Sequence, residues 1–452
     1  MGELILWIVV ILLVTLAIGA PVSFATGFTA VACMSILVST KFLPTFTNVA
    51  FGQASNPNQL VIPLFILMAE FLSRGEVAGD IYYVLNKYMK KIKGGLALST
   101  VLACTVFAAL VGSSPATAAS VGRISVDQMT KRGYKESFAV GTVAGGGTLG
   151  IMIPPSLVFV QFGILTETSI VKLFMAGLLP GIMLSALMCV SIVIRVKFDP
   201  TLIGESKRIK HSQKKEEIKE ADINAQRVSL VDMKQTTFLQ DCFMSVPSIV
   251  LIWLVLGCMY AGVATPTEAA SFGVIGAFVI LLVMRRMDKK VVKTSFKSTT
   301  KIAAMMLILM IAGLCLTQVI SRLGIATALA EGIIQSGMNK WVIMVLLYAL
   351  WYILGCLMSP GSMIVLTIPF IFPTLVALGF NPLWIGVVAT LCVEVGMITP
   401  PVGLNLFVLK SATNVNMKDI IVGALPYVVV LTLGLAILSF FPQLALIVPS
   451  TM

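Results

Sequence analysis

The sequence has few charged residues and almost no histidine. Charged side chains make up 12% of the 452 residues, whereas a soluble domain usually carries about 25%. The one histidine, His211, lies in a polar stretch, which argues against a His-based metal site or a Ser-His-Asp triad. The chain also has no G-x-x-x-x-G-K-[ST] loop, so nothing indicates a bound nucleotide. The eight cysteines form no Cys-x-x-Cys pair and are expected to be small core hydrophobes.

Apolar residues dominate the chain. They make up 58% of the sequence, and the mean hydropathy is +0.99. A soluble core could not bury so much apolar surface, so the sequence predicts an all-α polytopic membrane protein in a lipid bilayer. The opening run 4–20 is predicted to be a first spanning helix and not a cleaved signal peptide. The net charge of +12 is then expected to come from cytoplasmic loops and not from a nucleic-acid-binding surface.

The chain contains two similar halves, predicted at 1–197 and 244–452, with a basic cytoplasmic linker at 198–243. Five features recur at a nearly constant offset, which indicates duplication. Two pairs are separated by 245 residues and three by 246: Pro21 and Pro266, Ser114-Pro115 and Ser359-Pro360, then Gly133-Tyr134 and Gly379-Phe380, Gly150 and Gly396, Pro154-Pro155 and Pro400-Pro401. About five spanning helices are predicted in each half: 4–20, 22–40, 57–75, 137–165 and 171–197, then 245–263, 267–285, 300–321, 382–410 and 419–447. Amphipathic stretches lie at 78–93 and 323–338.

Each half also contains a proline-interrupted pair of segments. The apolar runs 96–126 and 340–378 are broken at Ser-Pro and are predicted to be re-entrant hairpins. The runs 137–165 and 382–410 are predicted to be helices broken at Pro-Pro, because proline removes a backbone donor and clashes with the preceding turn. Such motifs can merely kink helices. Two pairs in register favour instead a transporter binding site between discontinuous helices.

The basic residues predict the orientation of the chain. If both hairpins are re-entrant, each half crosses the membrane five times, and the halves are inverted relative to each other. With the N-terminus in the periplasm, 28 of the 32 Lys and Arg residues lie inside, and four lie outside: Lys41, Lys172, Arg322 and Lys340. The positive-inside rule therefore predicts a periplasmic N-terminus and C-terminus in a bacterial inner membrane.

The breaks also predict a chemistry. Backbone carbonyls that a break leaves unpaired are costly in hydrocarbon unless they line a cavity or bind a ligand. Carbonyl and hydroxyl oxygens suit a hard cation, and sodium is the natural candidate. The positive ends of the half-helices, together with Ser and Thr hydroxyls, suit a carboxylate or another anion.

These motifs resemble the large membrane subunit of the tripartite ATP-independent periplasmic (TRAP) transporters. The resemblance covers essentially the whole chain and is carried by four segments: Gly-Ser-Ser-Pro-Ala-Thr-Ala-Ala at 112–119, Pro-Pro-Ser at 154–156, Ala-Thr-Pro-Thr-Glu-Ala-Ala at 264–270 and Thr-Pro-Pro-Val-Gly-Leu-Asn at 399–405. Pro115, Cys392 and the long linker depart from the family pattern. The resemblance implies sodium-driven uptake of a small organic anion, a carboxylate or sulfonate, delivered by a periplasmic substrate-binding protein. It also implies a separate small four-helix membrane subunit.

The resemblance further implies two sodium sites, one at each hairpin tip, and an elevator-type mechanism. The hairpins and broken helices would form a transport domain that moves against a scaffold. The first sodium site would use Ser113, Ser114, Gly147, Ile151 and Pro154. The second would use Ser359, Gly361, Gly396 and Thr399. The substrate would lie between the tips, near Thr117, Ser156, Ser362, Val402 and Asn405.

Several further charged residues lie near the predicted helix ends and breaks. Arg123 is expected to anchor the first hairpin at the inner interface, with attraction of a substrate carboxylate as the alternative. For Glu394, an effect on ion binding and capping of broken-helix donors stand as equal alternatives. Glu268 is expected to cap a helix start, and Glu70 to pair with Arg74.

Two other functions remain open at this stage. One is a stand-alone sodium-coupled symporter of divalent anions that needs no binding protein. The other is an intramembrane hydrolase using Ser114 or Ser156, which is unattractive because no histidine or paired acid lies near either serine in the sequence.

Overall fold

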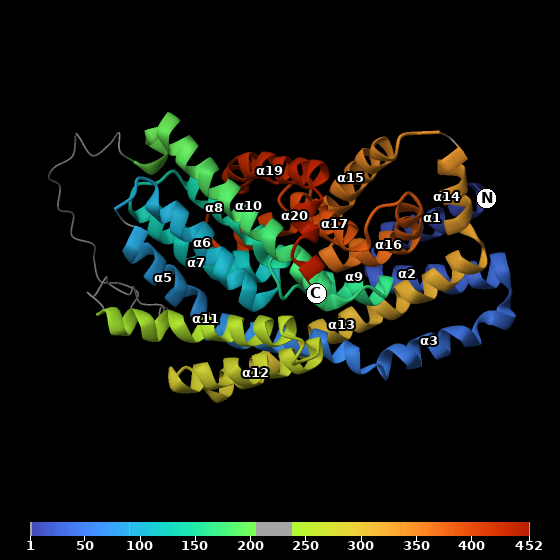
Figure 1. Ribbon diagram of the computed structural model, residues 1–452, viewed down its shortest axis with the longest axis horizontal. Coiled ribbons are helices and arrows are strands. Elements are labelled where there is room, and N and C mark those ends of the chain that lie inside the picture. Colours follow the sequence, from blue (N-terminus) through green and yellow to red (C-terminus); the bar gives the residue numbers. More distant parts are fainter. Residues whose placement is uncertain (1, 90, 205–236, 336, 452) are drawn as a thin grey trace.

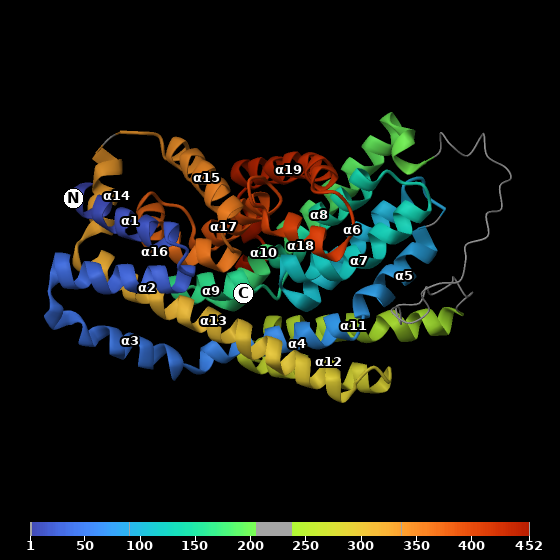
Figure 2. The same ribbon diagram turned by 180° about the vertical axis from the view of Figure 1, so that it is seen from behind.

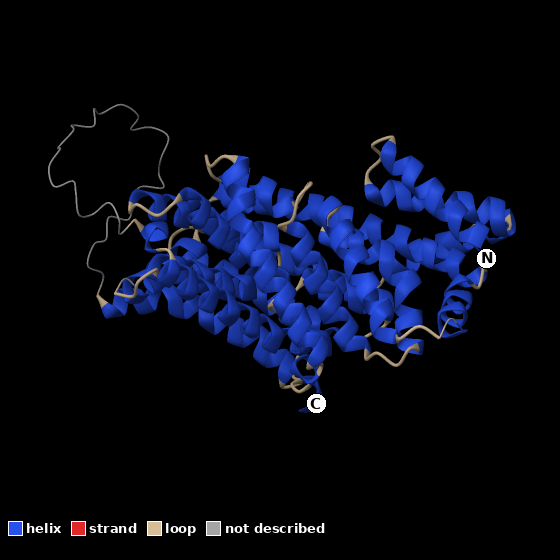
Figure 3. Cartoon of the chain, turned by 90° about the horizontal axis from the view of Figure 1, so that it is seen from above, coloured by secondary structure: helices blue, strands red, loops and turns tan. Residues whose placement is uncertain are grey.

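The computed structural model describes residues 2–89, 91–204, 237–335 and 337–451. Within these ranges the chain is helical and contains no strand (Figure 3). Eight spans in the described part are long and apolar enough to cross a membrane, counting the broken helix at 136–166 as one. The prediction of an all-α polytopic fold is therefore confirmed.

The helices of the two halves follow one another in a similar order (Figure 1). The first half contains α1 (Gly2–Ala17), α2 (Val22–Cys33), α3 (Pro44–Ala54), α4 (Val61–Arg74), α5 (Val77–Met89), α6 (Gly95–Val111), α7 (Ser114–Lys131), α8 (Glu136–Met152), α9 (Leu157–Thr166) and α10 (Ile170–Phe198). The second contains α11 (Phe238–Tyr260), α12 (Pro266–Val283), α13 (Lys289–Arg322), α14 (Ile325–Gln335), α15 (Lys340–Leu357), α16 (Pro360–Ala377), α17 (Pro382–Met397), α18 (Leu404–Ala412), α19 (Met417–Phe440) and α20 (Gln443–Leu446).

The four interrupted segments are each two helices joined by a short link. In the first hairpin, Gly112 ends α6 at a φ of 63°, a left-handed conformation that glycine tolerates best. In the second, Ser359 caps α16, and Pro360 occupies its first turn, where a missing backbone donor costs little. The double prolines lie in the links between α8 and α9 and between α17 and α18. Both Pro-Pro peptide bonds are cis.

The structure differs from the sequence prediction at two places. Helix α3 was not predicted; it ends before Asn56-Pro57, where Asn56 caps a following 3-10 turn. The corresponding stretch of the second half forms the start of the continuous α13. Helix α11 begins at Phe238, earlier than the predicted boundary at 244, because Thr237 and Gln240 form a capping box. Most of the predicted linker, residues 205–236, lies outside the described residues.

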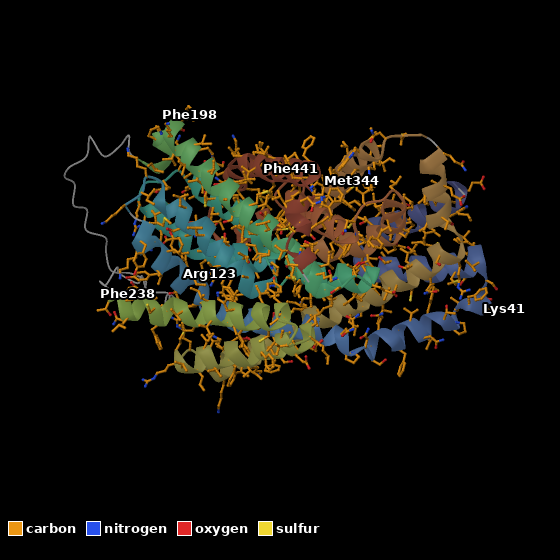
Figure 4. The ribbon with its side chains drawn as sticks, viewed as in Figure 1. Lys41, Arg123, Phe198, Phe238, Met344 and Phe441 are labelled. Carbon is orange, nitrogen blue, oxygen red and sulfur yellow. The ribbon has the colours of Figure 1, made fainter. Side chains whose placement is uncertain are left out.

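The helices form two layers that lie side by side, each running along the long axis of the molecule. Helices α3, α11, α12 and α13 form a layer on one side, and the hairpins and broken helices lie on the other (Figures 1 and 2). Helix α4 packs against both α12 and α13. The ring of Phe71 on α4 lies edge-to-face against the rings of Phe278 and Phe296, with ring centroids 6.2 Å apart in each pair. Lys41 lies at one end of the molecule, opposite Phe198 and Phe238, which flank the linker (Figure 4).

Two polar contacts stabilise single helices, and a third links two elements. Arg74 and Glu70 form the predicted ion pair at 2.8 Å. The predicted capping role of Glu268 is confirmed, because its carboxylate accepts the Thr265 backbone N–H at 2.8 Å. Arg286 donates to both carboxylate oxygens of Asp80, at 2.5 and 2.9 Å, and thereby ties α5 to the turn after α12.

Candidate functional site

The tip of the first hairpin packs directly against the first broken helix. A Cβ atom on Gly150 would lie 2.7 Å from the backbone of Ser113 and Ser114, so glycine is needed for this approach. Beyond the break, the backbone N–H of Leu157 donates to the carbonyl of Gly112 at 3.4 Å. The tip is therefore joined to both sides of the double-proline link.

The second tip repeats this arrangement at its own break. A Cβ atom on Gly396 would lie 2.4 Å from the carbonyl carbon of Gly355 and 2.8 Å from the nitrogen of Cys356. After the break, the N–H of Gly403 donates to the carbonyl of Cys356 at 3.0 Å. Gly150 and Gly396, which the sequence placed in register, thus each let a broken helix approach its own hairpin closely, but Gly150 meets the tip itself and Gly396 meets the last turn of α15.

The residues predicted for the first cation site gather around the first tip. Ser114 is fully buried, and its Oγ lies 3.1 Å from the carbonyl oxygen of Thr148 on α8. Gly147 faces the backbone of Ala118, where an added Cβ would meet the α7 backbone at 3.2 Å. The other predicted members lie on the same tip and break: Ser113, half-buried, and Ile151 and Pro154, both buried.

The residues predicted for the second site gather around the second tip. The hydroxyls of Ser359 and Ser362 are 2.7 Å apart, and Ser359 Oγ also accepts the backbone N–H of Ser362. Gly361 is buried next to them. Thr399, at the break, donates its hydroxyl to the carbonyl of Val395 at 2.6 Å.

Four of the five predicted substrate residues are buried between the tips and the opposite half. Helix α7 packs against α18, and α16 packs against α9, so each hairpin contacts the far half of the other broken helix. Thr117, Ser156, Ser362 and Asn405 are buried. Val402 is different, because 38% of it is exposed.

Several buried polar atoms in this region are unsatisfied. Thr117 Oγ1 and both amide atoms of Asn405 have no hydrogen-bond partner in the described part of the chain. The same holds for both amide atoms of Gln161 and for Glu394 Oε2. Buried polar groups are normally paired, and these four residues come from α7, α9, α17 and α18, the helices that surround the tips.

Gln161 has no predicted role, and Glu394 has an effect on ion binding only as one of two alternatives, so neither is among the residues predicted for a site. Ser114 Oγ lies 2.6 Å from Glu394 Oε1, so this carboxyl contacts the first tip although it belongs to the second half. Gln161, in α9, lies against Gly361 of the second tip. Each was visible in the sequence as a polar residue close to a break in an apolar run. Periodicity alone does not say which tip it faces.

The chemistry of the region is that of oxygen ligands. Among the described residues, no group of three His, Cys, Asp or Glu side chains is placed to hold a metal. A cation between tip and break would meet hydroxyl and carbonyl oxygens, which suit hard ions. Arg123 is exposed on α7 and is not one of the buried residues of either tip.

Comparison with known proteins identifies the family. Residues 9–444 match the family model of the tripartite ATP-independent periplasmic transporter, DctM component. The chain is 34% identical, over 88% of both chains, to the C4-dicarboxylate TRAP transporter large permease protein DctM of Pseudomonas aeruginosa. It is 32% identical to the ectoine/5-hydroxyectoine TRAP transporter large permease protein UehC of Ruegeria pomeroyi, over 86% of this chain and 85% of the relative.

A solved structure shares the fold. The YdaH transporter of Alcanivorax borkumensis, described as having an unusual topology, aligns with a TM-score of 0.62 and 15% identity, over 92% of this chain and 89% of the other. The relatives are transporter permeases and not enzymes, which removes the hydrolase alternative. This chain belongs to the DctM family of TRAP transporter large permeases.

Proposed function

We propose that this chain takes up a small organic anion, a carboxylate or sulfonate, by secondary active transport coupled to sodium. The names of its relatives support an organic acid as the class of substrate, since one carries C4-dicarboxylates and another ectoine. The observation that carries the proposal is the group of buried, unsatisfied polar atoms around the two tips, on Thr117, Gln161, Glu394 and Asn405. Such atoms are costly in a membrane interior unless a ligand pairs with them.

Sodium would bind at the two tips and the anion between them. The first cation site would use Ser113, Ser114, Gly147, Ile151 and Pro154, and the second Ser359, Gly361, Gly396 and Thr399. The anion would meet Thr117, Ser156, Ser362 and Asn405, while Val402 would lie at the edge of the site. Each net positive charge that moves inward gains about 2.3 kcal/mol per 100 mV, so coupling to more than one sodium ion drives an anion inward.

The two halves would act as inverted repeats in an elevator-type cycle. The hairpins and broken helices would move as a transport domain against the layer of α3, α11, α12 and α13. Within the scaffold, α4 packs against α12 and α13. The chain would lie in the bacterial inner membrane with both termini in the periplasm. Lys41 and the linker-flanking ends lie at opposite ends of the molecule (Figure 4), which agrees with this orientation.

Two protein partners complete the proposal: a periplasmic substrate-binding protein and a small four-helix membrane subunit. The word tripartite in the family description supports them. Purified components in liposomes test this directly. We expect uptake only when an inward sodium gradient, the small subunit and the loaded binding protein are all present. Sodium-driven uptake by this chain alone would favour the stand-alone symporter, and uptake that persists with choline in place of sodium would refute the coupling ion.

The orientation has its own test. Single cysteines at Lys41 and Lys289, both exposed, are labelled in whole cells with a membrane-impermeant maleimide, after the native cysteines have been replaced. We expect labelling at position 41 from the periplasm and at 289 only after the cells are opened. The reverse pattern would overturn the proposed topology.

A further inference from the structure

Glu394 places a carboxyl from the second half at the tip of the first hairpin. It lies in α17, one turn before the break, and is 1% exposed. Its Oε1 is 2.6 Å from Ser114 Oγ, the backbone of Ile151 also lies close to the carboxyl, and its Oε2 has no hydrogen-bond partner among the described residues. The carboxyl therefore lies among residues of the opposite half.

Three oxygens of different chemistry converge around Ser114. Ser114 Oγ is within hydrogen-bonding distance of two acceptors, the Thr148 carbonyl at 3.1 Å and Glu394 Oε1 at 2.6 Å. One hydroxyl proton can serve only one of them. The Ile151 backbone also approaches the carboxyl, yet Glu394 Oε2 has no partner among the described residues. A buried hydroxyl, carbonyl and carboxylate this close together are the oxygen ligands that a hard cation prefers.

Gln161 is a polar side chain of the first half that lies at the tip of the second hairpin. It is fully buried in α9, and a Cβ atom on Gly361 would lie 2.5 Å from its Oε1 and 2.8 Å from its Nε2. The glycine is therefore what lets this amide reach the tip. Both amide atoms lack a partner in the described part of the chain, while the hydroxyls of Ser359 and Ser362 pair with each other beside it.

We infer that each cation site is completed by a side chain of the opposite half: the Glu394 carboxylate at the first tip and the Gln161 amide oxygen at the second. The inference rests on the proposed sodium coupling. It makes the two sites chemically unequal, because one contains a formal negative charge and the other contains only neutral oxygens. It also gives a physical link between the halves, since neither site is complete without both.

The test measures sodium binding without transport. The purified full-length chain in lipid nanodiscs is titrated with sodium chloride, with choline chloride at constant ionic strength as balance, and thermal stabilisation is recorded, because a ligand that binds only the folded state raises its stability. We expect Glu394→Gln to raise the half-saturating sodium concentration by about tenfold or more, since the charge of a hard-cation site strongly tunes its affinity. We expect a smaller rise, about threefold, for Gln161→Leu, which removes a neutral oxygen.

Matched controls separate this effect from general damage. Thr390 and Thr166 lie on the same helices as Glu394 and Gln161 and donate only to their own helix backbone or to a neighbouring threonine. Thr390→Val and Thr166→Val should therefore leave the sodium titration unchanged. If Glu394→Gln does not fold, Glu394→Asp carries the test, because it keeps the charge but withdraws it by one methylene and should shift the same titration.

The outcomes are distinct. An unchanged sodium titration in Glu394→Gln or in a folded Glu394→Asp overturns the role of the carboxyl. A Gln161→Leu variant that alters only the half-saturating substrate concentration, at saturating sodium, overturns the amide as a cation ligand and assigns it to the substrate. If the wild-type chain shows no sodium-dependent stabilisation, and the complete system with the small subunit and the loaded binding protein shows no sodium-dependent uptake, the proposed function itself fails.

Discussion

The two hairpin tips share a backbone plan but differ in their side chains. At both, a glycine in register lets the hairpin lie against its own broken helix, at the tip in the first half and at the last turn of α15 in the second. The first tip is the more buried, with Ser114 fully enclosed and a carboxyl beside it, whereas Ser359 is half-buried and pairs with Ser362. The two tips therefore share a glycine-mediated approach to their broken helices but differ in charge. In the proposed mechanism, the two tips would then bind the same cation with different affinities.

The largest expected effect is at the serines. Ser114→Leu and Ser359→Leu should each abolish sodium-dependent uptake, because an apolar side chain replaces a hydroxyl oxygen at the tip. Both should also lower thermal stability: Ser114→Leu because overfilling a closed site typically costs about 1–3 kcal/mol, and Ser359→Leu because it removes the cap of α16, which typically costs about 1 kcal/mol. Uptake assays with quantified membrane insertion check both, and normal uptake by either inserted variant would refute the tip assignment.

The next effect is at the register glycines. Gly150→Ala and Gly396→Ala should each lower uptake and stability to a similar degree, because the new Cβ would meet backbone at 2.7 and 2.4 Å, and backbone cannot move aside as a side-chain end can. Gly257→Ala is the control, since a Cβ there meets nothing within 4 Å. A large effect at only one of the two positions would break the equivalence of the tips.

A smaller effect sharpens the contrast at the second tip. Gly361→Ala should reduce uptake, because its Cβ would displace the Gln161 amide. Adding Gln161→Ala to Gly361→Ala should relieve the clash, so the double variant should lose less than the sum of the two single losses. Neighbouring pairs commonly show coupling of about 0.5–3 kcal/mol in such cycles. Strict additivity would show that the amide does not occupy the tip.

The smallest effect is at the exposed edge of the substrate region. Val402→Ala should change the half-saturating substrate concentration by about twofold or less, which corresponds to roughly 0.4 kcal/mol, because 38% of the residue is exposed. Asn405→Ala, at a fully buried position with two unsatisfied atoms, should have a much larger effect in the same assay. Equal effects would place Val402 deeper in the site than its exposure indicates.

Much of the fold could be predicted from the sequence, because glycine and proline affect the backbone conformation at their own positions in the chain. Gly112 with its left-handed φ and the double prolines Pro154-Pro155 and Pro400-Pro401 interrupt the helices where the sequence predicts it. Single prolines do not, since Pro180 and Pro247 lie inside continuous helices. The sequence does not predict helix α3, because none of its residues is buried and it therefore has no apolar face to show a pattern. It ends just before Asn56, which caps the following turn. The early start of α11 depended on a capping box just outside the apolar run.

The site was predictable only within each half. The offset of 245 or 246 residues ties each tip to its own break, and those contacts are present. The offset does not describe how the two halves pack against each other. The contacts of Glu394 with Ser114 and of Gln161 with Gly361 could therefore not be predicted from it. Contacts between segments far apart in the chain depend on tertiary packing, which local patterns do not encode.

Helix α13 has a consequence for how the protein sits in its bilayer. It is continuous over 34 residues, about 51 Å at 1.5 Å per residue, whereas the hydrocarbon core is about 30 Å thick. Five lysines occupy its start, and the apolar part follows Lys301. The lysine-bearing turns must therefore stand among the headgroups, where each basic residue gains about 1 kcal/mol from anionic lipid. Because one unbroken helix joins the two regions, bilayer thickness and surface charge would together set the tilt of the layer against which the hairpins rest.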